Sequence, residues 1–451
     1  MVAQDHTYFG YDEINKIKVG IPQSARPYHQ AVFGATGTGK STILFSQMVD
    51  DIRQDRGFAF LDPHGNTAER LLYEIPEDKM KRVIYFNPAD LEYPIGLNLL
   101  GKVKIGEKDF LVEDLLDILQ SIWQIGSGEQ QIPEGIDVLA NALAALVDVP
   151  EGSTFLGVPR MLTDPYFRQQ VARSIKNEAV RPYWTLEYAN LLKSNRNTGR
   201  SILHRARRLT RPRVIRNIIG QTETRIDFEQ VMNEGYFLIA NLSRGKIRDQ
   251  NTRLLGSFLL SQFLRATMAR EGMPESERKP FTIYLDEFQY FAAQPGTLST
   301  MLSEARKYKV GLVVANQYLD QLDKKLLAAV LGNVGTYITL RLHYEDAARM
   351  AKEFHHSWDA AKLVSLKKSE MYYKVKDSAY EEPREAKTIA MPEQPQAASK
   401  RAAAEARKRR LIKFCRQTYG RPRQEVEKEI KQFYESYKPQ VNGTLRKTTP
   451  K

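Results

Sequence analysis

Short apolar runs alternate along the chain with longer stretches in which apolar residues recur every three to four positions. The short runs are typical of strands buried on both faces of a sheet, and the longer stretches have helical periodicity. Strands that alternate with helices indicate a largely parallel sheet with crossover helices. The predicted strands are His29–Gly34, Gly57–Leu61, Arg82–Phe86, Tyr236–Ala240, Phe281–Leu285, Gly311–Ala315 and Thr336–Leu342.

A long interval between the third and fourth predicted strands has helical periodicity instead. Its helices are expected at Phe110–Trp123, Gly135–Val147, Asp164–Lys176 and Pro182–Leu192. This interval predicts an α-helical domain inserted into the α/β core. Further helices follow the last strand, and then come a Pro-, Gln- and Ala-rich linker near Glu381–Ser399 and two basic helices, Lys400–Thr418 and Gln424–Tyr437.

Composition is that of an ordinary soluble protein, with 42% apolar and 27% charged residues in a chain long enough for two or three domains. The longest apolar stretches, Val138–Val149 and Leu254–Leu264, fall short of the roughly eighteen residues that a membrane span needs. The single Cys415 excludes an internal disulfide framework and suits a cytoplasmic protein. The seven His residues show no metal-ligand spacing, so we expect no zinc site.

Positive charge is concentrated in two places. Residues 400–451 contain sixteen Lys and Arg against five Asp and Glu, and so hold most of the net charge of +13. Residues 193–216 contain nine Lys and Arg and no acid. A basic run can be a solvated face, but an acid-free Arg cluster is also suited to an anionic polymer. The candidate nucleic-acid contacts are Arg205, Arg207, Arg208 and Arg211.

Residues 34–41 fit the phosphate-binding pattern G-x-x-x-x-G-K-[ST], directly between an apolar strand and a helical stretch. The glycines allow successive backbone N–H groups to turn around an anion. Lys40 is expected to reach the β- and γ-phosphates, and the Ser41 hydroxyl to ligate Mg²⁺. The predicted ATP contacts in this loop are Gly34, Thr36, Gly37, Thr38, Gly39, Lys40, Ser41 and Thr42.

A second motif is the apolar strand Phe281–Leu285 followed by two carboxylates, which is the Walker B pattern. Asp286 at the strand tip can hold the Mg²⁺ shell. Glu287 can orient and polarise the attacking water as general base. An apolar strand followed by Asp-Glu is common in proteins, so this pattern alone is weak evidence for a Walker B motif. The phosphate loop in the same chain makes the evidence strong.

Three further positions lie where such a site forms. Gln317 follows an apolar strand and could sense the γ-phosphate, although an Asn-Gln pair can also simply begin a loop. Arg306 precedes that strand, either as a salt-bridged surface residue or as a finger that reaches a neighbouring subunit. Asp62 begins the turn Asp62-Pro-His-Gly65 at the carboxyl edge of the sheet, where ligands bind, and we expect it to contact the nucleotide. His64 in this turn is interpreted as a lining residue and not as an acid or base.

Together these motifs resemble the ATPase core of the HerA/FtsK superfamily, and within it the coupling proteins of type IV secretion and conjugative DNA transfer. The resemblance extends from about Tyr8 to Phe354, with a weaker echo at Tyr419–Arg423. Besides the two Walker motifs it rests on blocks that occur in order, namely Asp62–Gly65, Ile84–Pro88, Asn217–Gln221, Leu238–Ser243, Leu285–Gln289, Ser303–Tyr308 and Leu331–Thr336.

The resemblance implies a homohexamer of RecA-like P-loop NTPase subunits with ATP sites between them, which moves DNA and delivers it to a secretion apparatus. The family's phosphate and Mg²⁺ ligands match Lys40 and Ser41, and its Walker B carboxylates match Asp286 and Glu287. The sensor glutamine matches Gln317, and a trans-acting arginine finger matches Arg306. The implied organisation is a core of residues 1–104 and 196–355, an all-α domain of residues 105–195, a linker of residues 356–399 and a basic helical tail of residues 400–451.

Membrane-bound members of that family begin with transmembrane helices, whereas here the phosphate loop starts at Gly34. Docking at a membrane would therefore need partners such as secretion-pore subunits or a relaxase, unless the chain is a soluble form of the family or its anchor lies outside this sequence. Three alternatives stay open: a HerA-like motor for DNA processing or packaging, a secretion ATPase that acts on protein, and a nucleotide-gated adaptor that does not hydrolyse ATP.

Overall fold

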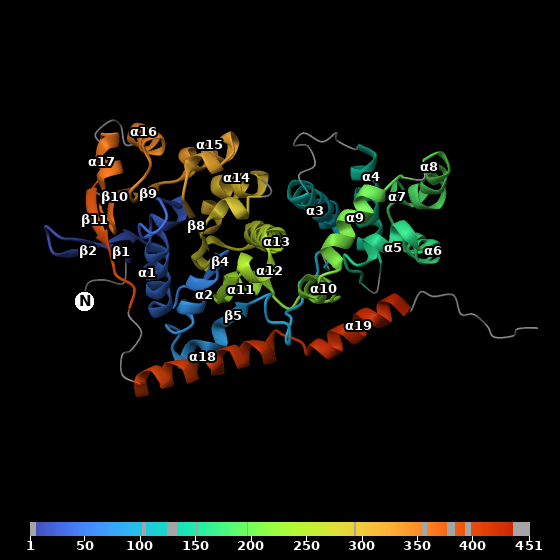
Figure 1. Ribbon diagram of the computed structural model, residues 1–451, viewed down its shortest axis with the longest axis horizontal. Helices are drawn as coiled ribbons and strands as arrows, with labels where there is room; N and C mark the ends of the chain where they lie inside the picture. The colour runs from blue at the N-terminus through green and yellow to red at the C-terminus, as the bar shows by residue number, and fades with distance from the viewer. Residues whose placement is uncertain are drawn as a thin grey trace, which may run out of the picture. The chain divides into compact units, whose positions relative to one another are not determined.

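The computed structural model describes residues 6–101, 105–123, 133–149, 152–195, 197–292, 295–353, 359–376, 384–392 and 398–435. These residues include an eleven-stranded sheet with the order β2-β1-β11-β10-β9-β3-β8-β7-β4-β6-β5 (Figure 1). The strands are β1 His6–Asp12, β2 Ile17–Pro22, β3 Gln30–Phe33, β4 Phe58–Asp62, β5 Val83–Phe86, β6 Phe237–Asn241, β7 Phe281–Leu285, β8 Val310–Asn316, β9 Thr336–Thr339, β10 Glu370–Val375 and β11 Arg384–Thr388.

The strands from β9 to β5 are parallel, and all seven were expected from their apolar runs. Their residues are almost entirely buried because helices cover both faces of the sheet. Burial on both faces favours apolar residues at every position, so these strands appear in the sequence as continuous apolar runs. The sheet and the helical insertion confirm the predicted α/β fold of the RecA-like P-loop NTPase type. Parallel strands place their carboxyl ends, and the loops after them, along one edge.

The other four strands are antiparallel and correct two expectations from the sequence. Strands β1 and β2 precede the phosphate loop, where the strand leading into that loop was expected to be the first. Residues 356–399 were expected to form a linker, but β10 pairs with β9 and with β11, and β11 pairs with β1. The short, charged sequence of β11 lacks an apolar run, so its pairing partners decide its conformation.

The described helices divide between two compact units. Described residues of 1–95, 117–127 and 225–420 form one unit, which contains the sheet, and those of 96–116, 128–224 and 421–451 form the other. The α-helices are α1 Lys40–Arg53, α2 Asn66–Leu71, α3 Lys108–Ile122, α4 Pro133–Val147, α5 Gly157–Thr163, α6 Pro165–Ser174, α7 Val180–Pro182, α8 Tyr188–Ser194, α9 Arg200–Thr210, α10 Arg213–Ile219, α11 Phe228–Glu234, α12 Arg244–Ile247, α13 Asp249–Met268, α14 Pro295–Glu304, α15 Lys324–Asn333, α16 Tyr344–Glu353, α17 Ala360–Ser365, α18 Ala398–Thr418 and α19 Arg423–Glu435.

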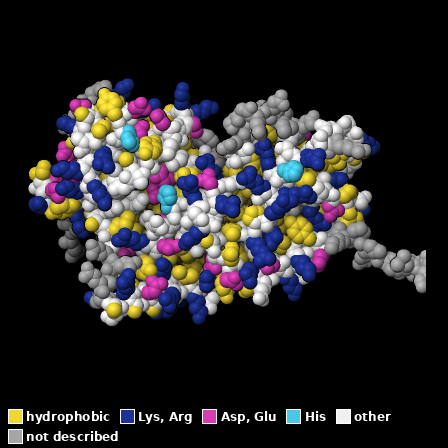
Figure 2. Space-filling model, in the orientation of Figure 1, with side chains coloured by type: hydrophobic (Ala, Val, Ile, Leu, Met, Phe, Trp, Pro, Cys, Tyr) yellow, Lys and Arg dark blue, Asp and Glu magenta, His cyan; other side chains and the backbone are white. Residues whose placement is uncertain are grey.

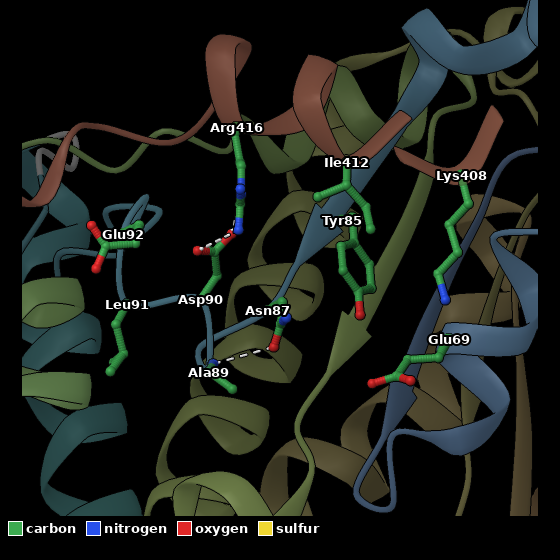
Figure 3. Close-up of a pocket in the computed structure, with 10 residues that line it drawn as sticks. All are labelled: Glu69, Tyr85, Asn87, Ala89, Asp90, Leu91, Glu92, Lys408, Ile412 and Arg416. Atoms are coloured by element: carbon green, nitrogen blue, oxygen red, sulfur yellow. Dashed lines mark hydrogen bonds and ion pairs between the residues drawn. The ribbon is translucent and has the colours of Figure 1, made fainter. Parts of the chain in front are cut away.

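Helix α18 packs along β5, the strand at one edge of the sheet (Figure 1). Its Leu411 and Cys415 belong to the core of the sheet-containing unit. Arg416 of α18 binds Asp90 through two nitrogen–oxygen contacts of 2.6 and 3.1 Å, and Figure 3 shows its side chain directed at the loop after β5. The helix therefore shields an edge strand that would otherwise expose unpaired backbone groups. No helix among the described residues is long and apolar enough to cross a membrane.

Burial raises the pKa of the Cys415 thiol to about 12. A thiol that stays protonated is a poor nucleophile, because the thiolate is the reactive form. The structure therefore gives Cys415 a packing role in α18.

Candidate functional site

The phosphate loop connects β3 to α1, and its conformation depends on glycines. Gly37 and Gly39 have φ angles of +75° and +129°, which residues with a side chain rarely adopt. The loop ends at Lys40, the first residue of α1, so the free N–H groups of that helix face the loop. A helix N-terminus with this approach is suited to bind an anion.

The phosphate loop and the Walker B carboxylates meet in the structure. Strand β8 lies between β3 and β7, so both motifs reach the same edge of the sheet. Ser41 Oγ donates a hydrogen bond of 3.0 Å to Asp286 Oδ2. Lys40 Nζ lies 3.8 Å from Glu287 Oε1 and donates to the carbonyl of Gly34 at 2.7 Å. Four residues predicted from two distant motifs therefore lie within contact distance.

The buried carboxylate of Asp286 is electrostatically unfavourable. Burial is the main reason that the pKa of Asp286 rises to about 7, and the neighbouring carboxylates of Asp62 and Glu287 raise it further. Its Oδ1 is buried without a hydrogen-bond partner among the described residues. A hydroxyl and an unpartnered carboxylate oxygen are the hard donors that Mg²⁺ prefers. The residues present therefore fit a Mg²⁺ ion, held by Ser41 and Asp286.

Glu287 is held in an unusual backbone conformation. Its φ of +47° and ψ of +55° lie in the left-handed region, which is uncommon for a residue with a side chain. Strain of this kind tends to occur at functional sites. Gln289 Nε2 donates to Glu287 Oε2 at 2.9 Å and fixes one carboxylate oxygen. Gln289 lies only two residues beyond the Walker B motif, and no local pattern predicted this contact.

Asp62 lies at the same edge, but backbone groups occupy its carboxylate. Its two oxygens accept hydrogen bonds from the N–H groups of His64 (2.8 Å) and Ala68 (2.9 Å). Asp62 therefore shapes the turn between β4 and α2 and adds negative charge next to Asp286. Its contact with a nucleotide stays a prediction.

Gln317 follows the carboxyl end of β8, beside the start of the phosphate loop. Phe33 pairs with Asn316 in the sheet, and the Gly34 N–H donates to the Asn316 carbonyl at 3.3 Å. The side chain of Asn316 is fully buried, and its Nδ2 has no partner among the described residues. The sensor role of Gln317 stays a prediction. The buried amide of Asn316 is a polar group next to it that was not among the predicted site residues.

Arg306 lies far from the phosphate loop of its own chain. It belongs to the 3₁₀ turn η8 (Ala305–Tyr308), which precedes β8 and so lies at the opposite edge of the sheet from the phosphate loop. Strand β8 rises roughly 3.3 Å per residue over Val310–Asn316, which separates the two edges by about 20 Å. The exposed Arg306 therefore does not reach the phosphate loop of its own chain.

Backbone and side-chain contacts of the phosphate loop also come from the residue before β10 and from β11, which the sequence did not predict as a strand. The Ser369 N–H donates to the Thr38 carbonyl at 3.1 Å, and the Thr388 N–H donates to the Ser369 carbonyl at 2.9 Å. A Cβ atom on Gly39 would lie 3.2 Å from the methyl group of Thr388. The β10–β11 segment thus supports the loop from its outer side.

The four candidate nucleic-acid contacts lie on α9 and directly after it. The buried positions Ile202, Ala206 and Leu209 form one face of α9, and the Arg residues lie on the rest of its surface. Arg208 and Arg211 are exposed, and Arg205 and Arg207 are half-exposed. Figure 2 shows Lys and Arg side chains gathered over α9 and α10. Their contact with DNA stays a prediction.

A cavity of about 500 Å³ lies below α18, beside the loop after β5 (Figure 3). Its charged lining groups already have partners, since Asp90 binds Arg416 and Glu69 binds Lys246. The cavity is separate from the phosphate loop and offers no cluster of unpaired cations for a nucleotide.

The buried His29 predicts a pH dependence of stability. Burial lowers the pKa of His29 to about 4, from an ordinary value of about 6.5. Between these two pKa values the unfolded chain binds a proton at His29 and the folded chain does not. The contribution of His29 to the free energy of unfolding is therefore fully present above pH 6.5 and is lost as the pH falls towards 4. His29 has φ +64° and ψ +162°, a conformation that residues with a side chain rarely adopt, and Asn must adopt it as His does. His29→Asn removes the titrating group without changing this backbone requirement.

Between pH 7 and pH 5 the parent should lose about 2 kcal/mol of unfolding free energy that His29→Asn does not lose. Urea unfolding of both proteins at the two pH values measures this difference, because other titrating groups are common to both. Equal losses would contradict the assignment of a neutral, buried His29.

Comparison with known proteins assigns the chain to a protein family. The family model of the helicase HerA central domain matches residues 15–263, which include the phosphate loop. The chain belongs to the HerA central-domain family. No curated protein matches the chain.

Solved structures confirm the fold of this HerA-family chain. The unbound bacterial conjugative coupling protein TrwBdeltaN70 has a TM-score of 0.60 at 15% identity, covering 87% of this chain and 90% of that chain. The plasmid coupling protein TrwB in complex with ADP and Mg²⁺ has a TM-score of 0.59 at 15% identity, with coverage of 84% and 89%. VirB4 of Thermoanaerobacter pseudethanolicus has a TM-score of 0.58 at 12% identity, with coverage of 87% and 98%.

Proposed function

We propose that this protein is a hexameric, ATP-driven DNA translocase of the coupling-protein type. The observation that carries the ATPase part of the proposal is the contact between Ser41 and Asp286, which joins the phosphate loop to the two Walker B carboxylates. Such a site binds the phosphates of ATP at the N-terminus of α1 and brings a general base to the γ-phosphate.

Each residue has a distinct task in this proposal. The loop N–H groups and Lys40 bind the phosphates. Ser41 and Asp286 would hold Mg²⁺, which neutralises charge on the transferring phosphoryl group. Glu287, whose carboxylate is fixed by Gln289, orients the attacking water and accepts its proton. Gln317 responds to the presence of the γ-phosphate.

The hexamer is supported by the position of Arg306. This cation is too far from its own phosphate loop to stabilise the transition state there, but it is exposed and could complete the site of an adjacent subunit. A family relationship to HerA and the fold similarity to TrwB both support this arrangement. Arginine fingers supplied in trans contribute about 10³–10⁵-fold to phosphoryl transfer.

Conjugative coupling is the setting that fold similarity to TrwB supports, with a relaxase or secretion-pore subunits as partners that recruit the protein to a membrane. A secretion ATPase is the second candidate, because VirB4 is matched over 98% of its length. The two differ in cargo, so stimulation of ATP turnover by DNA distinguishes them.

DNA-dependent ATP turnover of the full chain tests the proposal, with oligomer size measured in parallel. We expect DNA to stimulate turnover of the hexamer, because a motor couples hydrolysis to its track. Turnover that is indifferent to both single- and double-stranded DNA would contradict the DNA translocase and favour the secretion ATPase. Hydrolysis limited to a single turnover would favour the adaptor.

The double variant Arg208→Ala, Arg211→Ala should weaken this stimulation and leave basal turnover unchanged. These exposed side chains would bind phosphates without reading sequence, so each lost contact lowers the salt dependence of DNA binding by about one unit of slope. Arg173→Ala, Lys176→Ala removes the same charge from exposed positions of the same unit and serves as the control. Equal DNA affinity of the two double variants would contradict the assignment of α9.

A further inference from the structure

The turn that carries Arg306 is held by two other arginines. Arg270 is almost fully buried, and its Nη1 donates to the Tyr308 carbonyl at 2.9 Å. Arg278 Nη1 donates to the Lys307 carbonyl at 2.9 Å. Two carbonyl groups of η8 are therefore fixed from outside the turn, which limits the backbone positions that Arg306 can take.

His29 fixes the helix that leads into this turn. The Leu312 N–H donates to His29 Nδ1 at 3.0 Å, so this nitrogen is an acceptor and the proton lies on Nε2. His29 Nε2 donates in turn to the carbonyl of Leu302, in the last turn of α14, at 3.0 Å. A neutral imidazole therefore links β8 to the segment before Arg306.

Tyr28, the residue before His29, lies directly under the guanidinium. Arg306 Cζ is 4.2 Å from the centroid of the Tyr28 ring, and Lys376 Nζ is 5.0 Å from the same centroid. The Tyr28 carbonyl accepts a hydrogen bond of 2.7 Å from the Gly335 N–H. A Cβ atom on Gly335 would lie 2.9 Å from the Tyr28 Cβ, so this close approach requires glycine.

The Tyr28 ring is thus a fixed surface over which the exposed Arg306 guanidinium lies. An Arg side chain loses considerable rotamer entropy when it is ordered, and a stacked aromatic ring reduces that cost at the moment of reaction. No ion pair joins Arg306 to a carboxylate within the part of the chain that the structure describes. Stacking on Tyr28 therefore orients the Arg306 guanidinium and leaves its positive charge available to bind a negatively charged phosphate.

We propose that Tyr28 is a positioning residue for Arg306, which it holds ready for the nucleotide of the adjacent subunit. This inference rests on the proposed role of Arg306 as a trans-acting finger. Tyr28 does not touch the nucleotide, and it acts by holding the guanidinium on its π face. Its loss should therefore lower kcat while ATP affinity and hexamer formation stay as in the parent.

Steady-state ATP turnover of the full chain tests the proposal with Tyr28→Leu, Tyr28→Met and Tyr28→Phe. Leu and Met keep an apolar side chain without a π face and should lower kcat by about three- to thirtyfold. Phe keeps the ring and should stay within about twofold of the parent. Tyr73→Leu removes a half-buried ring that Lys408 covers at 4.4 Å elsewhere in the unit, and serves as the matched control.

Comparison with Arg306→Ala separates the two claims. If Arg306→Ala abolishes turnover while Tyr28→Leu and Tyr28→Met leave kcat unchanged, the positioning role is wrong and the finger stands. If Arg306→Ala leaves turnover unchanged, the finger is wrong, and the positioning role is wrong with it. Addition of Tyr28→Leu to Arg306→Ala should cause no further loss, because the ring acts only through the guanidinium. Loss of kcat in Tyr28→Phe equal to that in Tyr28→Leu, or a rise of kcat in either variant, would also overturn the inference.

Discussion

Glu287→Gln is expected to lower ATP turnover by about a hundred- to ten-thousandfold, since it removes the proposed general base. Nucleotide affinity should stay within a few-fold of the parent, because the phosphate contacts come from the loop and Lys40, which the amide does not displace. Steady-state hydrolysis and equilibrium binding of a fluorescent ATP analogue measure the two quantities separately.

Glu229→Gln is the control, because it makes the same change at an exposed position of α11. It should leave both quantities unaltered. If Glu287→Gln turned over ATP at a rate near that of the parent, the base would have to be another group, and the strained backbone of Glu287 would need a different explanation.

Arg306→Ala is expected to lower turnover by about 10³–10⁵-fold, the range for arginine fingers supplied in trans. ATP binding should remain nearly intact, because the finger stabilises charge that develops in the transition state. Lys307→Ala removes a neighbouring exposed cation from the same turn and should have little effect. Loss of ATP binding in Arg306→Ala would refute its assignment as a finger.

The sequence predicted the parallel part of the sheet well because burial on both faces leaves a direct signature. β4 and β7 are short apolar runs whose every residue is buried, and their ends bear the predicted carboxylates Asp62 and Asp286. Local motifs with fixed spacing similarly predicted the phosphate loop and the Walker B pair.

The antiparallel strands could not be predicted in this way. Four of the five residues of β11 are polar or charged, and its strand conformation depends on pairing with β1 and β10, which are separate segments of the sequence. The Pro-, Gln- and Ala-rich composition near Glu381–Ser399 therefore suggested the wrong state for residues 384–388, and residues 370–375 were wrongly included in the same linker region.

Contacts within the site between residues far apart in the sequence could not be predicted from local patterns either. The stacking of Arg306 on Tyr28 joins two positions that no motif connects, and the chain fold alone brings them together. His29 was predicted only as the start of a strand, although it bonds to both β8 and the end of α14. Such supporting residues follow from packing, and no local pattern reveals them.

An equimolar mixture of Glu287→Gln and Arg306→Ala subunits tests the shared site most directly. Each variant alone should be nearly inactive. In mixed hexamers, an Arg306→Ala subunit keeps Glu287 and can receive the intact Arg306 of a Glu287→Gln neighbour, so about a quarter of the interfaces should be complete after random assortment. The account predicts recovery of turnover to about that fraction of the parent rate. Mixed hexamers that form but recover no turnover would contradict an ATP site shared between subunits.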